Sequence, residues 1–445
     1  SLETKDELAL VVKLKPVLVK ALKEKNLFQL FTALEMPLSS VVACMEQEGI
    51  KLDLDLLKNL SRDIEKRLIK LIEDIYTASG TQFNINSPKQ LGQVLFEKLN
   101  LPVVKKTKTG PSTDEEVLKR LANKHPLPAF LLEYRQLTKL KNTYVDALPK
   151  LVNAQTGRVH TSFNQTQTET GRLSSSNPNL QNIPVKTEIG AKIRQAIIAT
   201  GKNNCLLSCD YSQIELRVLA HLSGDDTLLK AFQDHQDVHC LTASLIHNIP
   251  ESEVKNSMRE VAKRVNFGII YGQSAYGLSK DLEIPMDQAQ NFIDAYFLRY
   301  PKVKSYIEAQ IQKARDQGYV TTLLGRIRYI PEINNKNISI RQFAQRQAVN
   351  TPIQGTASDL IKLAMIKIFN QVNTLGLKTK MILQIHDELV FDLPVSELDV
   401  LASLVKNEME NVMQLDVPIK IEMKMGKNWL QMSAYRLPTG RQGGN

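Results

Sequence analysis

The chain has 445 residues, of which 42% are hydrophobic and 23% are charged, with only 20 Gly and 18 Pro. These values exclude a fibrous, collagen-like or mainly disordered protein, and the length is too great for one ordinary hydrophobic core, so we expect two or three subdomains. The 57 Lys and Arg outnumber the 47 Asp and Glu, giving a net charge of +10 that attracts polyanions, although many basic proteins bind no nucleic acid.

Hydropathy and cysteine usage predict a protein of the reducing interior of a cell. No run of about 18 apolar residues occurs, and residues 1–10 lack the pattern of a signal peptide, so we expect a cytoplasmic protein with no membrane partner. The cysteines have no CxxC spacing, which favours free thiols over a zinc site or disulfides. They are Cys44, Cys205, Cys209 and Cys240.

The N-terminal third is predicted to be mostly α-helical. Residues 1–35 are Lys-rich with a helical pattern, and their start without a methionine suggests a longer parent protein. Amphipathic helices follow from 37 to 149, interrupted by a polar loop at 105–116. Residues 98–141 carry ten Lys and Arg against four Asp and Glu. Such an arm could follow a phosphate backbone, although charge alone favours a solvated surface.

Irregular, strand and helical patterns alternate in the rest of the chain. Residues 158–184 are rich in Ser, Thr, Asn and Gln, and a linker is the simplest interpretation. We expect a buried strand at 205–210, helix from 212 to about 346, a second helix from 355 to about 372, and a β-hairpin at 380–394. The fold class is therefore predicted to be α+β, with a small antiparallel sheet whose strands are separated by a large helical insertion.

Two acids occupy matching places in the predicted sheet. Asp210 ends the buried strand, and Asp387 lies in the hairpin turn beside Glu388. If the strands pair, the carboxylates converge, and their repulsion raises a pKa unless a divalent cation such as Mg²⁺ neutralises them. Two such ions could stabilise the attacking and leaving oxygens of a phosphoryl displacement. Strand-end acids are usually only solvated, so this pair alone is weak evidence.

A helix with one cationic and aromatic face adds to the acids. Arg259, Lys263 and Phe267 are four residues apart, so each step drifts only about 40° around the helix. Placed opposite the acids, the two cations could hold a triphosphate, while Phe267 and Tyr271 offer flat surfaces for sugar and base. For the helix alone, an ordinary amphipathic helix with a core Phe is the preferred interpretation.

Five motifs in order make coincidence very improbable. Together they resemble the polymerase region of family A DNA polymerases, over residues 35–429. The motifs are TGRLSSSNPNLQNIP (170–184), DYSQIELR (210–217), RxxxKxxxFGxxYG (259–272), QRQAVNTPIQGTASD (345–359) and HDE (386–388).

The resemblance implies a right-hand polymerase with an antiparallel palm sheet, helical fingers and a helical thumb. The chain before the thumb-like part is too short for the family's proofreading exonuclease or 5′ nuclease, so we expect neither activity from this chain. The implied parts are an N-terminal helical remnant or linker (1–35), thumb (36–155), palm (156–224 and 346–435), fingers (225–345) and a disordered tail (436–445).

The family's metal-binding residues match acids already singled out. Asp210 and Asp387 correspond to the two catalytic, metal-binding aspartates of the palm, with the Tyr211 carbonyl as a further ligand. Glu388 corresponds to a nearby, less essential catalytic acid. The resemblance implies two Mg²⁺ ions, for which Mn²⁺ is a substitute.

The helix motif and its neighbours imply a nucleotide site. Arg259 and Lys263 correspond to residues that grip the phosphates of the incoming nucleotide, with Gln213 and His239 as helpers. Lys263 is also a candidate general acid toward pyrophosphate.

Three further residues imply selection of the sugar. Glu215 matches the family's steric gate against the ribose 2′-hydroxyl, packing beside Tyr271. Phe267 stands where some relatives have Tyr, which implies discrimination against nucleotides that lack the 3′-hydroxyl.

A set of polar residues matches family positions that touch primer and template. Minor-groove acceptors are nearly alike for every base pair, so Arg, Asn and Gln there can test pair shape without reading sequence. For Asn179 and Gln181 taken singly, a structural role in turns is favoured instead. The set is Arg172, Asn179, Gln181, Arg346, Asn350, Gln354, Gln384 and His386, with Lys105, Lys106 and Lys108 at the thumb tip on duplex phosphates.

We therefore expect a monomeric DNA polymerase that binds primer-template DNA and deoxynucleoside triphosphates and works at the nucleoid of a bacterial-type cell; an organelle or phage origin stays open. A phage-type single-subunit RNA polymerase is a close alternative, against which Glu215 and Tyr271 argue. A DNA-binding module without catalysis is the alternative from another class.

Overall fold

The structure is a computed structural model that describes residues 2–107, 110–185 and 187–438, with side chains from residue 9 onward. Lys108, predicted at the thumb tip, and residues 439–445 of the predicted disordered tail lie outside the described residues. All four cysteines are free thiols, and Cys205 and Cys209 are buried, as predicted.

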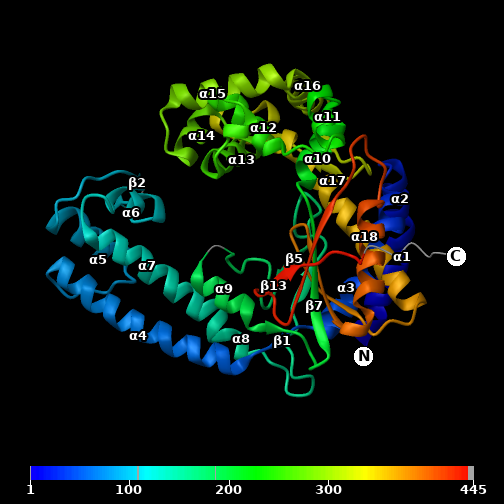
Figure 1. The fold of residues 1–445 in the computed structure, drawn as a ribbon, viewed down its shortest axis with the longest axis horizontal. Coiled ribbons are helices and arrows are strands. Elements are labelled where there is room, and N and C mark those ends of the chain that lie inside the picture. The colour runs from blue at the N-terminus through cyan, green and yellow to red at the C-terminus, as the bar shows by residue number, and fades with distance from the viewer. Residues whose placement is uncertain (1, 108–109, 186, 439–445) are drawn as a thin grey trace.

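A five-stranded antiparallel sheet forms the centre of the molecule (Figure 1). Its middle strand comes from the first half of the chain, and its neighbours follow more than a hundred residues later, which confirms the predicted split sheet and hairpin. The strand order is β10 (Lys380–Ile385), β11 (Glu388–Pro394), β7 (Asn204–Tyr211), β12 (Ile421–Gly426) and β13 (Met432–Ala434).

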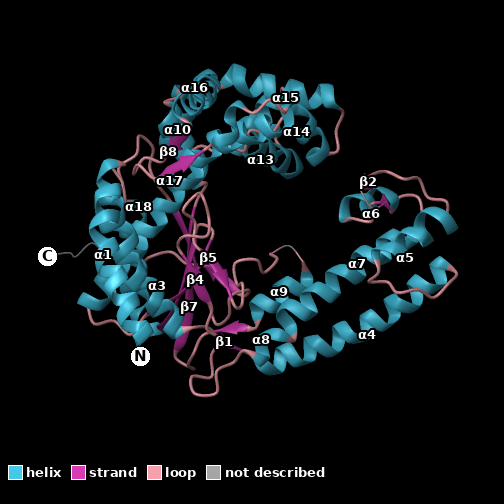
Figure 2. Cartoon of the chain, turned by 180° about the vertical axis from the view of Figure 1, so that it is seen from behind, coloured by secondary structure: helices cyan, strands magenta, loops and turns pink. Residues whose placement is uncertain are grey.

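Helices cover one side of this sheet, and two helical arms extend from it (Figure 2). The covering helices are α3 (Met36–Glu48), α17 (Ile338–Thr374) and α18 (Leu398–Glu410); α3 packs on β10 and α17, and α18 packs on β7 and β12. Residues of α17 from Thr351 to Leu360 are nearly all buried, so this part of the helix is enclosed by protein on most sides and lacks an amphipathic period.

The first arm, residues 54–150, is built on two long helices. In α4 (Leu54–Ser79), Asp53 caps the first turn by accepting from Leu56 N, and the αL residue Gly80 ends the helix. The apolar stripe of α4 packs on α7. The other elements of the arm are α5 (Pro88–Gly92), β2 (Lys106–Thr107), β3 (Gly110–Pro111), α6 (Glu115–Leu121), α7 (Pro126–Leu140) and α8 (Ala147–Lys150).

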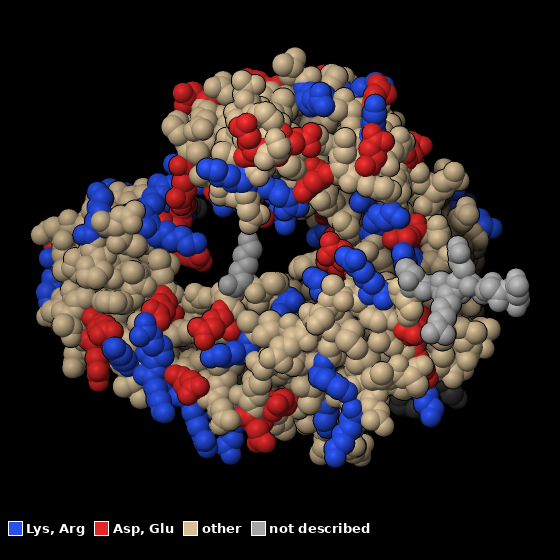
Figure 3. All heavy atoms as spheres, viewed as in Figure 1, with Lys and Arg blue, Asp and Glu red and all other residues tan. Residues whose placement is uncertain are grey.

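The second arm, residues 214–317, is also helical. The sequence predicted one helical stretch here, but Gly, Asn and Pro at the junctions divide it into separate helices. Figure 3 shows a hollow between the two arms, with Lys and Arg side chains along part of its edge. The helices are α10 (Ile214–Ser223), α11 (Asp226–Gln233), α12 (Val238–His247), α13 (Asn256–Ile270), α14 (Ala275–Leu282), α15 (Met286–Arg299) and α16 (Pro301–Gln317).

Two details differ from the sequence prediction near residue 346. A short hairpin, β8 (Tyr319–Thr321) with β9 (Ile327–Tyr329), interrupts the predicted helix. Helix α17 then runs unbroken from Ile338 through Pro352, where a break before Gly355 was predicted. Burial on several sides holds the helix together despite the lost N–H of Pro352.

Within the described residues, one helical segment is long and apolar enough to cross a membrane, although only by length and composition. It spans Phe28–Glu48 and comprises α2 (Phe28–Leu30), a π-helical stretch (Phe31–Glu35) and α3. Core helices of water-soluble folds pass the same test. Its residues Leu34, Leu38, Val41 and Met45 are buried in the protein, and α3 packs on the sheet and α17, so we interpret it as a core helix.

The remaining elements are short. Helix α1 (Leu2–Glu24) precedes α2, and α9 (Glu188–Gln195) leads into β7. Two small sheets join distant segments, namely β1 (Lys51–Leu52) with β6 (Ile197–Ile198) and β4 (Ser162–Asn164) with β5 (Ser174–Ser176).

A buried charge cluster ties the N-terminal helices to α17. Glu35 accepts from Arg326 and, at 2.8 Å, from Lys362 Nζ. Arg326 also donates to Asp359 at 2.7 Å. The Lys362 and Asp359 side chains are 1% and 0% exposed, so each charge depends on its partners for stability.

Replacing Lys362 by Met should therefore lower the free energy of unfolding by about 3 kcal/mol, because Glu35, whose side chain is only 18% exposed, is left with one cation fewer. Urea unfolding measures the change. The matched control is the exposed Lys304→Met on α16, for which we expect no shift. Equal midpoints for Lys362→Met and the wild type would contradict a stabilising role for the cluster.

Candidate active site

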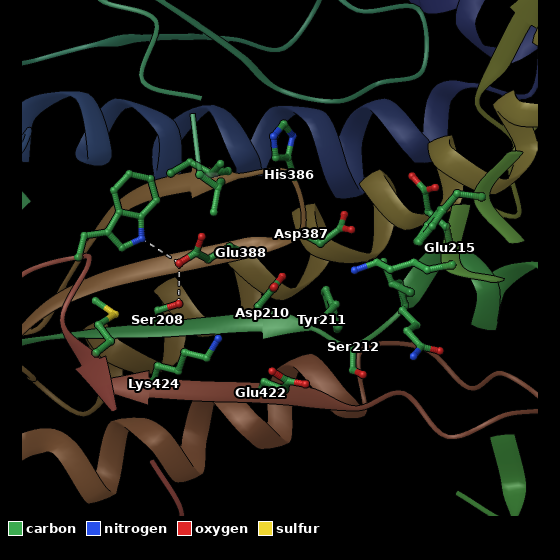
Figure 4. A pocket seen from close by; sticks show the side chains of 18 of the residues that line it. Ser208, Asp210, Tyr211, Ser212, Glu215, His386, Asp387, Glu388, Glu422 and Lys424 are labelled. Carbon is green, nitrogen blue, oxygen red and sulfur yellow. Dashed lines mark hydrogen bonds between the residues drawn. The ribbon is translucent and has the colours of Figure 1, made fainter. Parts of the chain in front are cut away.

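A cleft of about 700 Å³ lies above the central sheet and contains most of the predicted catalytic and nucleotide-binding residues. Figure 4 shows the acids of the sheet on its floor. The predicted residues that line it are Asp210, Tyr211, Gln213, Glu215, His239, Arg259, Lys263, Phe267, His386, Asp387 and Glu388.

Pairing of β7 with β11 brings the two predicted aspartates together. Asp210 is opposite Glu388 in the register, and Tyr211 N donates to Asp387 O at 3.1 Å. Burial has the largest effect on the pKa of Asp210, followed by the negative charges of Glu388 and Asp387, and together they raise it to about 7. The side chain of Asp210 is nevertheless partly exposed to the cleft. Burial also raises the pKa of Asp387, against the opposing effect of Arg172. The two strands pair as predicted, and the negative charges of Glu388 and Asp387 contribute to the raised pKa of Asp210.

Glu388 is fixed in place by two hydrogen bonds that sequence reasoning missed. Its Oε1 accepts from Ser208 Oγ at 2.6 Å and from Trp429 Nε1 at 2.9 Å (Figure 4). Ser208 is two residues before Asp210 in the same strand, so strand alternation could have found it. Trp429 lies 41 residues after Glu388 in the chain, and no local signal points to it.

Glu215 is held at the centre of a second group of predicted residues. It is 3% exposed, and its carboxylate accepts from Arg172 Nη2 at 2.7 Å and from Tyr271 Oη at 3.0 Å. Gln354 also hydrogen-bonds to it. Burial raises the pKa of Glu215, and Arg172 opposes that rise. The predicted neighbourhood of Glu215 and Tyr271 is present.

The predicted cations of α13 face the cleft, but one of them already has a partner. Arg259 Nε donates to Asp237 Oδ2 at 2.6 Å, an ion pair absent from the sequence prediction. Lys263 lines the cleft beside it. Asp237 also caps α12 by accepting from His239 N, so the cap and the ion pair share one side chain.

A neutral histidine and the ring of Phe267 complete this side of the cleft, and Tyr271 lines a neighbouring pocket. Burial lowers the pKa of His239 to about 4, and its Nδ1 is 2.9 Å from the side-chain amide nitrogen of Asn266. The ring of Phe267 lies 6.0 Å from His239 and 6.2 Å from Tyr271, stacked on the latter. The rings of Phe267 and Tyr271, four residues apart, therefore lie next to each other at the C-terminal end of α13.

Among the predicted DNA contacts, three polar residues form a chain along β10. Gln181 Nε2 donates to Gln384 O at 3.0 Å, and Gln384 Nε2 donates to His386 O at 2.6 Å. Asn179 accepts from Gln181 N, the turn role that was favoured for it. Asn350 Oδ1 is buried and has no hydrogen-bond partner within the described part of the chain.

The other predicted DNA contacts lie farther out. Arg346 packs beside Gly272 and borders a neighbouring pocket with Lys263 and Tyr271. Lys105 and Lys106 lie at the tip of the first arm, where β2 is labelled in Figure 1. Lys105 is paired with Asp114 at 2.6 Å, so its charge is partly neutralised inside the arm.

Comparison with known proteins decides the family. The sequence pattern of DNA polymerase family A matches residues 54–431. This chain belongs to that family. It is 48% identical to "DNA polymerase I" of Bacillus subtilis (strain 168) over 94% of this chain and 47% of the relative, and 48% identical to "DNA polymerase I, thermostable" of Thermus aquaticus over 92% and 49%. It therefore spans about half the length of these relatives.

A solved family structure has the same fold. The "POL domain of Pol1 from M. smegmatis complex with DNA primer-template and dNTP" matches with a TM-score of 0.90 and 41% identity, over 94% of this chain and 74% of that one. The right-hand polymerase fold, with its α+β sheet and helical arms, is thus confirmed for this family A chain.

The acids of this family A cleft fit a hard divalent cation whose ligands are only partly supplied by protein. Within the described residues, no group of three or more His, Cys, Asp or Glu side chains is arranged to hold a metal ion. Mg²⁺ characteristically takes one or two carboxylates and completes its shell with water and substrate phosphates. Asp210 and Asp387, close together with raised pKa values, are a donor set of that kind.

The raised pKa of Asp210 should make the metal-free protein less stable as pH rises. Folded Asp210 keeps its proton up to about pH 7, whereas the ordinary pKa is 3.8, so the folded state binds more protons between these values and loses stability through that window. In EDTA, Asp210→Asn should therefore unfold at a higher temperature than the wild type at about pH 8, and the difference should shrink toward pH 4. Thermal unfolding across pH measures this, with the exposed Asp294→Asn as control. If the difference in unfolding temperature between Asp210→Asn and the wild type were the same at every pH, the raised pKa of Asp210 could not be its cause.

Proposed function

We propose that this chain is a DNA-directed DNA polymerase, which adds deoxynucleotides to the 3′-hydroxyl of a primer along a DNA template and releases pyrophosphate. The observation that carries the proposal is the convergence of Asp210 and Asp387 on the floor of a cleft whose other wall presents Arg259 and Lys263. The M. smegmatis relative, solved with a DNA primer-template and dNTP, supports the same partners.

In this proposal, Asp210 and Asp387 hold two Mg²⁺ ions, or Mn²⁺ in their place, with the Tyr211 carbonyl as a further ligand. Bound ions would stabilise the attacking and leaving oxygens of the displacement. Glu388 is held by Ser208 and Trp429 and has a supporting role beside Asp210.

The wall formed by α12 and α13 is proposed to bind the triphosphate. Arg259 and Lys263 supply positive charge, with Gln213 and His239 as polar helpers. Because His239 is neutral at physiological pH, it hydrogen-bonds without adding charge. Lys263 can give a proton to the leaving pyrophosphate.

The packing suggests how the parts of the hand are divided. We propose the first arm as thumb, the central sheet with its covering helices as palm, and the second arm as fingers. The thumb then begins near Leu54, later than residue 36, because α3 packs on β10 and α17 of the palm. The proposed primer and template contacts are Arg172, Asn179, Gln181, Arg346, Asn350, Gln354, Gln384, His386, Lys105 and Lys106, in a monomer acting at the nucleoid of a bacterial-type cell.

Asp387→Asn should reduce primer extension on the order of a thousandfold, since it removes one of two anionic metal ligands. The affinity for primer-template DNA should stay largely intact, because phosphate contacts elsewhere supply most of it. Single-turnover extension with a binding assay measures both, and Asp294→Asn is the control. Substantial extension by Asp387→Asn would refute the ligand role, whereas intact binding with no Mg²⁺ dependence in the wild type would favour a non-catalytic DNA-binding module.

Glu215→Ala should allow the incorporation of ribonucleotides. The buried carboxylate, which accepts hydrogen bonds from Arg172 and Tyr271, would no longer occupy the space beside the sugar. We expect the preference for dNTP over rNTP to fall at least about tenfold, as expected for loss of a shape contact. Competitive incorporation assays measure the ratio, with Glu308→Ala on α16 as control. If the wild type itself preferred rNTP, the RNA polymerase alternative would stand instead.

A further inference from the structure

The cleft floor carries a lysine that the proposed chemistry has not used. Lys424 of β12 lies opposite Ser208 of β7, as Glu422 lies opposite Asp210. Opposed residues of antiparallel strands share a face, so Lys424 is on the same face as Asp210, one row away. Figure 4 shows the Lys424 side chain rising beside Ser208 and Asp210. The side chain is exposed to the cleft.

A second cation stands at the same end of the cleft. The guanidinium of Arg194, on α9, lies 3.9 Å above the ring of Trp429. Among the described residues, its guanidinium makes one long hydrogen bond, from Nη2 to Ile183 O at 3.4 Å, and its buried Nε has no partner. A buried donor without a partner is unusual in a native fold and indicates a group that a ligand can satisfy.

Neither cation is neutralised by a neighbouring acidic side chain. Within the part of the chain that the structure describes, Arg194 and Lys424 form no ion pair, in contrast to Arg259 and Arg172, which do. Both line the same cleft, together with Trp429. Two uncommitted positive charges beside a nucleotide cleft form a phosphate-binding arrangement.

Their position relative to α13 indicates which phosphate they bind. Strand β7 runs toward α10, and α10 packs on α13, so Arg259 and Lys263 lie beyond the Asp210 end of the strand. Lys424 and Arg194 lie on the other side of Asp210, by Ser208 and Trp429. In an in-line displacement the attacking and leaving oxygens are on opposite sides of the phosphorus. If α13 receives the leaving pyrophosphate, the primer enters from the side of Lys424.

We propose that Lys424 and Arg194 bind the last phosphodiester of the primer and so position its 3′-hydroxyl beside Asp210 and Asp387. The row spacing from Asp210 to Ser208, two strand residues or about 6.6 Å, is of the size of one nucleotide. Lys424 supplies a compact charge and Arg194 a planar donor set fixed by stacking on Trp429. This inference rests on the proposed polymerase function and names a phosphate site for one of its substrates.

The test removes the charge on the protein and on the DNA separately. Wild type and Lys424→Met are compared on two primers, one normal and one with a methylphosphonate in place of its last phosphodiester, under single-turnover conditions. With the wild type, the neutral linkage should slow extension and weaken binding of the primer terminus roughly tenfold, as for a lost charge-assisted hydrogen bond. With Lys424→Met, the normal primer should show a similar loss and the neutral linkage should add little.

Control variants separate contact from structure. Lys424→Arg should restore the sensitivity to the linkage, and Lys406→Met, an exposed lysine on α18 behind the sheet, should behave as the wild type. Lys424→Met could instead slow extension of both primers by the same factor and leave the effect of the neutral linkage unchanged. Lys424 would then act only through the charge of the nearby acids, and the proposal would be overturned. Failure of the wild type to extend the normal primer would instead overturn the polymerase function.

Discussion

The pairing of β7 with β11 is the constraint on which the rest of the site depends. It joins a strand that ends at Tyr211 to one that begins at Glu388, and the hydrogen bond from Tyr211 N to Asp387 O fixes the turn beside Asp210. A slip of one residue would turn Asp210 to the other face of the sheet. Leu207, Cys209 and Tyr211 are buried on the face opposite Asp210, where Tyr211 Oη donates to Met409 O of α18 at 3.0 Å, so such a slip is costly. Core packing thereby places the two aspartates that are proposed to hold the metal ions.

The acids of the cleft fall into two kinds. Glu388 and Glu215 are each held by two or more side-chain donors, which fixes their orientation. For the carboxylates of Asp210 and Asp387, the described contacts include no such donor, and burial raises both pKa values. The orientations of Glu388 and Glu215 are therefore set by the protein itself, whereas the carboxylate oxygens of Asp210 and Asp387 remain available to an external cation. Such unrelieved repulsion is a cost to stability that functional sites commonly carry.

Local sequence signals predicted the sheet hairpin, the acids and the cationic face of α13, because strand alternation and helical period are properties of short segments. They did not predict the ion pair of Arg259 with Asp237, the bond from Trp429 to Glu388 or the pairing of β12 with β7, since each joins segments whose register only the folded chain sets. The unbroken α17 was missed for another reason. Burial of its central residues outweighs the local preference of Pro352 for a helix break.

In the proposed function, charge balance links the binding of the nucleotide to the binding of the metal ions. The floor is a row of three carboxylates, Glu388, Asp210 and Glu422, which repels phosphate, and the neutral His239 adds no compensation. Arg259 forms an ion pair with Asp237, so α13 alone offers an incoming triphosphate less positive charge than its sequence suggests. In the proposed function, divalent cations on the floor would reduce the repulsion of phosphates above it, and the phosphates would stabilise the cations. By thermodynamic reciprocity, each would then raise the affinity of the other by the same factor, so the charges of the cleft would be balanced only with nucleotide and cation both bound.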